Sequence, residues 1–195
     1  IIMDLHSRKI VAHETWEAEN AEHSKALLRR ACLSENIAAS ASPVILHGDN
    51  GSPLKAGTVI ALMEFLGITP SHSRPRVSND NAFAEAIMRT AKYNPTLPPQ
   101  GFGCLYDARV WADQFVQYYN GEHRHSALRF VTPNQKHNAQ DVEILKNRAS
   151  VYQKAKAKSP HRWTRGITRN WQPVGATSLT PIDPYQLEKT IKKSA

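Results

Sequence analysis

Apolar residues in the first half of the chain occur either as short continuous runs or as stripes with helical spacing. The runs within 1–5 and 9–16 are rich in β-formers and are joined by three polar residues, which predicts a β-hairpin. A stripe at 20–34 predicts an amphipathic helix. The run at 44–47 shows no polar alternation, so we expect a short central strand that is covered on both faces.

The middle of the chain continues this alternation of runs and stripes. A stripe at 58–66 predicts a second helix, and Gly67 is suited to end it in the left-handed conformation. The run at 68–71 predicts another strand. Strands and helices that alternate along a chain are typical of an α/β layer fold, here with a mixed sheet.

Two further helices are predicted from caps and breakers. The first begins near Asn81, is capped by Asn79 or Asp80, and ends near Tyr93 because three prolines follow. The second runs from Asp107, its expected cap, to Asn120 and Gly121. Its expected apolar face contains Val110, Trp111, Phe115 and Tyr118.

The last third of the chain changes character. Thr132 and Pro133 supply a capping hydroxyl and a first-turn proline, which predicts a helix start. Residues 141–158 are expected to form a helix with a basic end. From Ser159 onward, prolines and scattered tryptophans predict a loosely folded segment.

Composition excludes several classes of protein. Of the 195 residues, 41% are hydrophobic, which is ordinary for a globular protein. No apolar run reaches the length that a membrane span needs, and the first residues do not resemble a signal peptide. The chain begins with Ile1, so we expect a piece of a longer reading frame. Cys32 and Cys104 lack metal-site spacing and are expected to be free, buried thiols in a cytoplasmic protein.

The net charge of +8 is concentrated at one end of the chain. Residues 1–145 contain 14 Lys and Arg against 15 Asp and Glu, a balance of −1, whereas residues 146–195 contain 11 against 2, a balance of +9. Such a tail is typical either of contact with DNA or RNA or of a solvated, solubilising segment.

Two carboxylates are the main candidates for chemistry. Asp49 follows the strand at 44–47, where α/β sheets commonly place ligands, and Glu85 lies on the helix that begins near Asn81. Carboxylates in this arrangement can hold a divalent metal ion. The alternative is that Asp49 only makes a turn.

The helix that carries Glu85 has one polar face. At helical spacing, Asn81, Glu85, Arg89 and Lys92 fall in one stripe, opposite an apolar face that includes Ile87. The alternative is an exposed face with a weak Glu85–Arg89 ion pair. Arg74 and Arg76, in the loop before this helix, are candidate phosphate contacts.

Four motifs in order resemble the catalytic core of insertion-sequence transposases of the IS-three type, and so the retroviral-integrase superfamily. The matching segments are Asp4-Leu5-His6-Ser7-Arg8-Lys9-Ile10-Val11, Leu46-His47-Gly48-Asp49-Asn50-Gly51-Ser52-Pro53, Ser78-Asn79-Asp80-Asn81-Ala82-Phe83-Ala84-Glu85, and Tyr118-Tyr119-Asn120-Gly121-Glu122-His123-Arg124-His125-Ser126-Ala127-Leu128 followed by Thr132-Pro133. The resemblance covers about residues 1–136.

The resemblance implies an RNase H-like mixed sheet flanked by helices, with an integrase-type core at 1–136 and a basic helical and loop segment at 137–195. It implies a site of three carboxylates that holds Mg²⁺ or Mn²⁺ for phosphodiester cleavage and strand transfer. Asp49 would match the second acid and Glu85 the third, and Lys92 would match a residue that contacts DNA.

The first acid of the family, and the first strand that carries it, have no counterpart in this sequence. Asp4 matches a position on the next strand that is not catalytic in the family. We therefore expect a chain that is inactive or weakly active by itself. The expected partners are transposon ends and target DNA, with a homo-oligomer that joins two ends and no membrane.

Other functions and residues are kept as alternatives. The chain could be a non-catalytic DNA-binding or oligomerising remnant, or an RNase H-like nuclease with another substrate. His123 and His125 could bind a metal ion, but packing or contact with a phosphate is the favoured role for them. Trp163 and Trp171, among arginines, could stack on DNA or form a small core.

Overall fold

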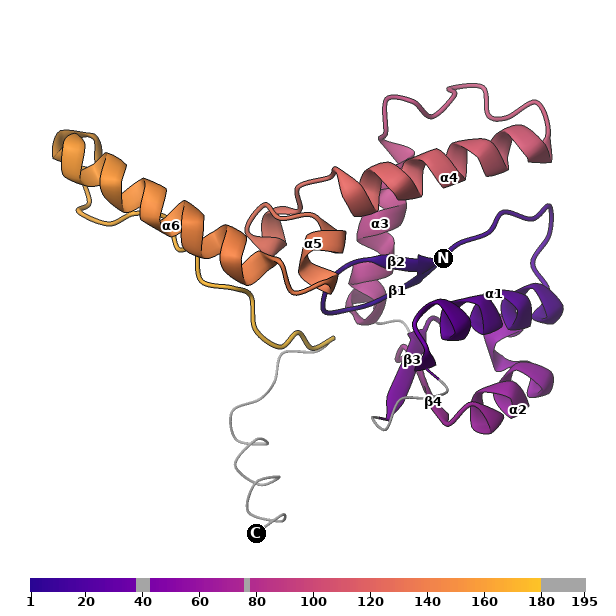
Figure 1. Cartoon of the computed structure of the whole chain (residues 1–195). Helices are drawn as coiled ribbons and strands as arrows, with labels where there is room; N and C mark the ends of the chain where they lie inside the picture. The colour runs from indigo at the N-terminus through magenta and orange to yellow at the C-terminus, as the bar shows by residue number, and fades with distance from the viewer. Residues whose placement is uncertain (38–42, 76–77, 180–195) are drawn as a thin grey trace, which may run out of the picture.

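The computed structural model describes residues 1–37, 43–75 and 78–179. A short hairpin and two helices lie at the centre, a strand pair covered by two helices lies on one side, and one long helix projects on the other (Figure 1). The mixed α/β character predicted from the sequence is confirmed. No helix in the described part is long and apolar enough to cross a membrane.

The predicted hairpin is confirmed. Strand β1 (Ile2–Met3) pairs antiparallel with β2 (Ile10–Ala12). The backbone amide and carbonyl of Ile10 also bind the side-chain amide of Asn120 in α4 (Leu105–Gly121), at 2.9 Å each. One buried amide group thus satisfies both polar backbone groups of Ile10 and fixes the hairpin against α4.

The second strand pair is parallel. Strand β3 (Val44–Gly48) pairs with β4 (Ile68–His72), with Val44 opposite Ile68. Helices α1 (Ala21–Ser34) and α2 (Gly57–Phe65) cover it, with a short 3₁₀ turn, η2 (Ser52–Lys55), between β3 and α2. Gly67 has φ 68° just past α2, as predicted.

The prediction that β3 is covered on both faces is wrong. Val44 and Leu46 pack into the core under α1 and α2, but Ile45 points the other way and is 66% exposed. In the described part of the chain, β3 pairs only with β4, and β1 only with β2. No strand there joins the two pairs, so neither strand of either pair has a second strand partner on its outer edge.

Helices α3 (Ala82–Lys92) and α4 pack with the hairpin in a second core. The cap and apolar face predicted for α4 need correction. Cys104 occupies the cap position, and Asp107 lies in the first turn. Phe115 is buried as predicted, but the buried face turns toward the hairpin, so Val116 and Tyr119 are covered while Val110 and Tyr118 are exposed.

The C-terminal part forms a third core. After the 3₁₀ turn η4 (Ser126–Leu128), Thr132 caps α5 (Pro133–His137) through a capping box with Gln135, which confirms the predicted start. Helix α6 (Asp141–Lys158) has the predicted bounds. Residues beyond it, including the 3₁₀ turn η5 (Pro160–Arg162), are mostly irregular, yet Trp171 is buried with Leu128, Val131 and Leu145.

Both cysteines are free, as predicted. Cys32 lies on the buried face of α1, which packs against α2 and β4, and burial raises the pKa of its thiol. Cys104 is exposed, which corrects the expectation that both thiols are buried. It is exposed because the cap position of α4 faces solvent rather than a core.

Candidate active site

The side chain of His47 ties the end of β3 to the start of α3. Its Nε2 lies 3.0 Å from the carbonyl oxygen of Asp80, and its Nδ1 lies 2.9 Å from Ser71 Oγ on β4. A carbonyl only accepts, so Nε2 donates, and in the neutral imidazole Nδ1 then accepts from the Ser71 hydroxyl. Asp49 follows His47 by two residues and Glu85 follows Asp80 by five, so this bridge joins the elements that carry the two acids.

Arg74 holds the side chain of Asp80. Its Nε and Nη2 donate to the two carboxylate oxygens at 2.9 and 2.8 Å, and its backbone N–H donates at 2.8 Å. These hydrogen bonds, above all those from the guanidinium, lower the pKa of Asp80 from 3.8 to about 2. The prediction that Asp80 caps α3 is therefore wrong, because its carboxylate faces back to Arg74 within the turn η3 (Ser78–Asn81). The side chain of Asn79, the other expected cap, lies outside the described residues.

Asp49 is exposed directly after β3. One carboxylate oxygen accepts from the Gly51 N–H at 2.9 Å, and the Asn50 side chain donates to the Ser73 carbonyl at 2.7 Å. The turn expected from these residues is thus present. The turn uses only one carboxylate oxygen of Asp49. The second oxygen can still bind a ligand, because no Lys or Arg among the described residues pairs with this carboxylate.

Glu85 lies in the first turn of α3 and is exposed. Neither it nor Arg89 has an ion-pair partner in the described part of the chain, so the alternative of a Glu85–Arg89 pair does not form. Lys92 is exposed in the last turn, and Asn81 is half-buried at the helix start. The opposite face is buried through Ile87, which is 2% exposed. The structure therefore places the polar stripe on the surface, as the spacing predicted.

The two arginines before α3 have different outcomes. The side chain of Arg74 is 67% exposed while it pairs with Asp80, so it keeps a solvent-facing side. Arg76 lies outside the described residues. The phosphate contacts expected of both stay predictions.

Asp49 and Glu85 supply two carboxylates, whereas the site implied by the family resemblance needs three. Among the described residues, no three His, Cys, Asp or Glu side chains gather so that they could hold a metal ion. Asp4 instead closes the hairpin turn by accepting from the backbone N–H groups of His6 and Ser7 at 3.2 and 3.0 Å. Burial acts to raise the pKa of Asp4, but the hydrogen bonds, chiefly from Ser7, outweigh it and lower the pKa.

His123 and His125 both make contacts with neighbouring groups of the chain. The ring of His123 stacks on Tyr119 at 5.4 Å between centroids, and His125 Nδ1 accepts from the Ala127 N–H at 3.2 Å. Burial lowers the pKa of both imidazoles. Of the two tryptophans left open by the sequence, Trp171 forms a small core and Trp163 is half-buried.

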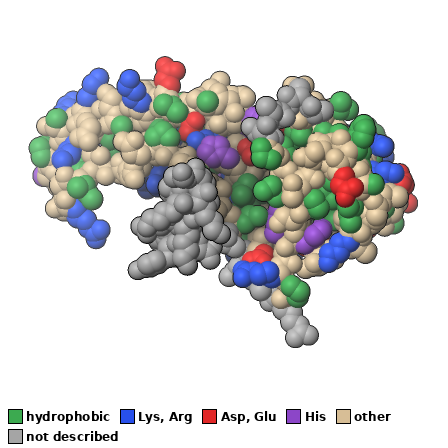
Figure 2. Space-filling model, turned by 90° about the horizontal axis from the view of Figure 1, so that it is seen from below, with side chains coloured by type: hydrophobic (Ala, Val, Ile, Leu, Met, Phe, Trp, Pro, Cys, Tyr) green, Lys and Arg blue, Asp and Glu red, His purple; other side chains and the backbone are tan. Residues whose placement is uncertain are grey.

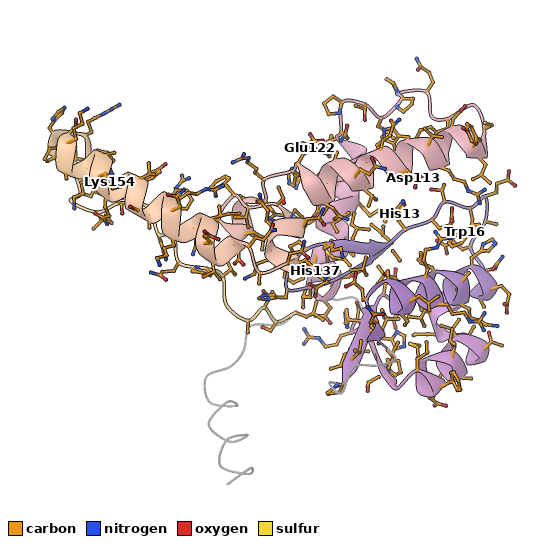
Figure 3. The ribbon with its side chains drawn as sticks, viewed as in Figure 1. His13, Trp16, Asp113, Glu122, His137 and Lys154 are labelled. Carbon is orange, nitrogen blue, oxygen red and sulfur yellow. The ribbon has the colours of Figure 1, made fainter. Side chains whose placement is uncertain are left out.

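Sequence reasoning missed two polar networks. One is the His47 bridge, whose only signal is a histidine at a strand end near an acid. The other joins α5 to the hairpin and to the end of α1: His137 Nε2 lies 2.9 Å from Glu35 Oε2, and its Nδ1 lies 3.1 Å from Ser7 Oγ (Figure 3). Its members lie about 100 residues or more apart, so no local pattern reveals it.

Comparison with known proteins shows which family the chain is similar to. Residues 1–78 and 66–133 match two family models, each described as an integrase core domain. Over 97 residues the chain is 34% identical to the putative transposase InsD for insertion element IS2E of Escherichia coli K12, a match that covers 48% of this chain and 43% of that protein. The identity is also 34% over 97 residues with the transposase InsD for insertion element IS2D of the same strain, where 31% of that protein is covered.

Residues 1–133 therefore belong to the integrase core domain family. Within that family, the chain is a relative of insertion-sequence transposases, which confirms the resemblance recognised from the four motifs. The match spans less than half the length of these relatives.

Proposed function

We propose that this chain acts in DNA transposition, as the part of a metal-dependent transposase core that carries the second and third acids. The observation that carries the proposal is the pair of exposed carboxylates, Asp49 and Glu85, on two elements joined by the bond from His47 to Asp80. The integrase core match across both acids and the transposase relatives support it.

The donor set fits Mg²⁺ or Mn²⁺. Both ions prefer hard oxygen ligands, and neither carboxylate is neutralised by a lysine or arginine among the described residues. Asp49 and Glu85 would hold the ion from the strand end and from the helix. When bound, the ion supplies charge stabilisation for the phosphoryl oxygens as a phosphodiester is cut and rejoined.

The chain's other groups position the DNA. Lys92 and Arg89 extend the face of α3 that carries Glu85, where their exposed cations meet phosphate oxygens. Asn81 adds an amide at the helix start, and the solvent-facing side of Arg74 is a further contact in the preceding loop. Arg76, which lies outside the described residues, stays a proposed contact from the sequence alone. Arg74 also holds the start of α3 in place through Asp80.

We propose that a further strand completes the core, because no strand among the described residues joins the two strand pairs. The two strand pairs keep open edges, and Ile45 of β3 is 66% exposed on the uncovered face. A strand that pairs along these edges would merge the two pairs into one RNase H-like sheet. We propose that this strand brings the first acid, and that the chain alone is therefore inactive or weakly active.

A second candidate is a non-catalytic DNA-binding or oligomerising remnant of a transposase. The observation that favours it is that no three metal-binding side chains gather in the described part of the chain. The two candidates differ in one respect. A remnant binds DNA equally well after Asp49→Asn and does not cut it with Mn²⁺, whereas the core cuts transposon-end DNA when the completing strand is restored.

Iron-directed cleavage of the polypeptide tests the shared site. Fe²⁺ that replaces Mg²⁺ generates hydroxyl radicals with ascorbate and cuts the backbone near its ligands. We expect cuts near both Asp49 and Glu85 that excess Mg²⁺ suppresses and that Asp49→Asn removes at both positions. Cuts at only one of the two positions, or cuts unchanged by Asp49→Asn, would contradict a common metal site. Asp107→Asn, which removes an exposed carboxylate on α4, is the matched control.

A further inference from the structure

The C-terminal third of the described chain forms a projecting arm. We define the arm as α6 together with residues 159–174, which run back alongside it (Figure 1). Helix α6 has 18 residues and so extends about 27 Å. Apart from its base, the arm stands clear of the elements that carry Asp49 and Glu85.

The arm is held together by specific contacts. Trp171 is 8% exposed and packs edge-on against Tyr152 of α6, with ring centroids 5.1 Å apart. Lys136 Nζ donates to the Val174 carbonyl at 3.1 Å, and Lys156 donates to the Gly166 carbonyl. The returning segment is thus fastened along the helix. The backbone positions from which the arm's charged side chains project are therefore fixed relative to one another.

The arm's charge is entirely of one sign beyond its first turn. Between Ile144 and Leu179 the sequence contains eight Lys and Arg and no Asp or Glu. Three of the eight serve the arm itself: Arg148 binds the carbonyls of Arg129 and Phe130, Lys156 binds Gly166, and Arg169 lies over the rings of Phe130 and Trp171.

The other five cations have no such role. They are exposed and have no hydrogen-bond, ion-pair or ring partner in the described ranges: Lys146, Lys154, Lys158, Arg162 and Arg165. Figure 2 shows Lys and Arg side chains spread over this end of the molecule, and Figure 3 places Lys154 far out on the helix. Lys154 and Lys158 are one turn apart, about 6 Å along the same face.

These features fit DNA better than a membrane. A helix that lies on a membrane needs a continuous apolar face. The apolar side chains Ile144, Leu145, Ala149 and Tyr152 of α6 instead pack into the arm's own core. Uncompensated cations repel one another, and a polyanion relieves that repulsion. A row of phosphates meets cations spaced along one helix.

We propose that the arm is a DNA-binding surface separate from the metal site, and that it contacts the phosphate backbone of a duplex without reading its sequence. The choice of DNA as the polyanion rests on the proposed function. The surface itself rests on the five free cations. A shallow groove of about 370 Å³ between α6 and the returning segment, lined by polar side chains that include Gln153, Lys156 and Asn170, adds hydrogen-bonding groups to it.

Fluorescence anisotropy with a short labelled duplex, in EDTA and over a range of salt, tests the arm. The variant is Lys154→Gln/Lys158→Gln. The control is Lys25→Gln/Arg29→Gln, which removes the same charge at the same spacing from α1. Because each phosphate contact contributes about 0.9 to the salt slope, we expect the arm variant to lower the slope by about 2 and to weaken binding by about tenfold at moderate salt. The control should leave the slope unchanged.

Two outcomes would overturn the proposal. One is equal slopes for the arm variant and the control. The other is a loss that depends on the duplex sequence, because phosphate contacts weaken binding to all sequences alike. Circular dichroism of each variant checks that it is folded. The result is independent of the metal site, because EDTA removes divalent ions and the same measurement in an Asp49→Asn background should show the same loss.

Discussion

His47 Nε2 donates to the carbonyl oxygen of Asp80 at 3.0 Å, and this bond joins the strand that precedes Asp49 to the turn that precedes Glu85. The contact is made by a half-buried side chain to a backbone group, so it holds the position of α3 whatever side chain stands at 80. It is therefore a positioning contact for the two acids.

Replacing His47 should separate these elements. His47→Ala leaves the Asp80 carbonyl and the Ser71 hydroxyl without their partner, so we expect a loss of about 1–3 kcal/mol in the free energy of unfolding, measured with urea. His47→Gln places an amide donor near the position of Nε2 and should recover part of the loss. His47→Asn, whose amide ends nearer the position of Nδ1, should recover less. Equal stability of all three variants would contradict the role of the Nε2 bond.

The ion pair between Lys136 and Asp141 is the most buried in the described part of the chain. The atoms Nζ and Oδ2 lie 2.8 Å apart, and the two side chains are only 8% and 3% exposed. Asp141→Ala leaves a buried ammonium without its counter-charge and should cost about 3–5 kcal/mol in unfolding free energy. The double variant Lys136→Met/Asp141→Leu should cost clearly less than Asp141→Ala, because no charge is left unpaired. A double variant as unstable as the single one would show that packing, not charge, dominates here.

Acid should weaken the anchoring of α3 through Asp80. The Arg74 hydrogen bonds lower the pKa of Asp80 to about 2, below its usual 3.8. A carboxyl whose pKa is lower in the folded state contributes its full stability above about pH 4, and that contribution is lost as the pH falls toward 2. Unfolding midpoints in urea should therefore fall more steeply over this range in the wild type than in Asp80→Asn. Asp107→Asn, at an unpaired carboxylate, should keep the wild-type slope, and an equally steep fall in Asp80→Asn would contradict the prediction.

Local patterns predicted most of the elements. The bounds of α6, the capping box at Thr132 and the left-handed Gly67 all follow from chemistry within a few residues. The exposed stripe of Glu85, Arg89 and Lys92 also follows, because helical spacing alone decides which residues share a face. The identities of the two candidate acids came from the order of motifs.

Contacts between distant segments were not predictable in this way. The run at 44–47 reads the same whether one or both of its faces are covered, so the exposure of Ile45 depends on which strands are present beside it. Asp80 was expected to cap a helix because the sequence does not show that Arg74 folds back onto it. The buried face of α4 is set by the hairpin, whose position depends on Asn120.

Titration with Mn²⁺, followed by the electron paramagnetic resonance signal of the free ion, tests the central claim most directly. The chain should bind the ion. Asp49→Asn and Glu85→Gln should each weaken binding by about tenfold or more, because even the loss of a residue that only supports a metal ligand weakens binding by that factor. Asp107→Asn and Glu64→Gln, at exposed carboxylates outside the site, should bind Mn²⁺ as the wild type does. Unchanged affinity in both Asp49→Asn and Glu85→Gln would mean that these two carboxylates do not share a metal ion.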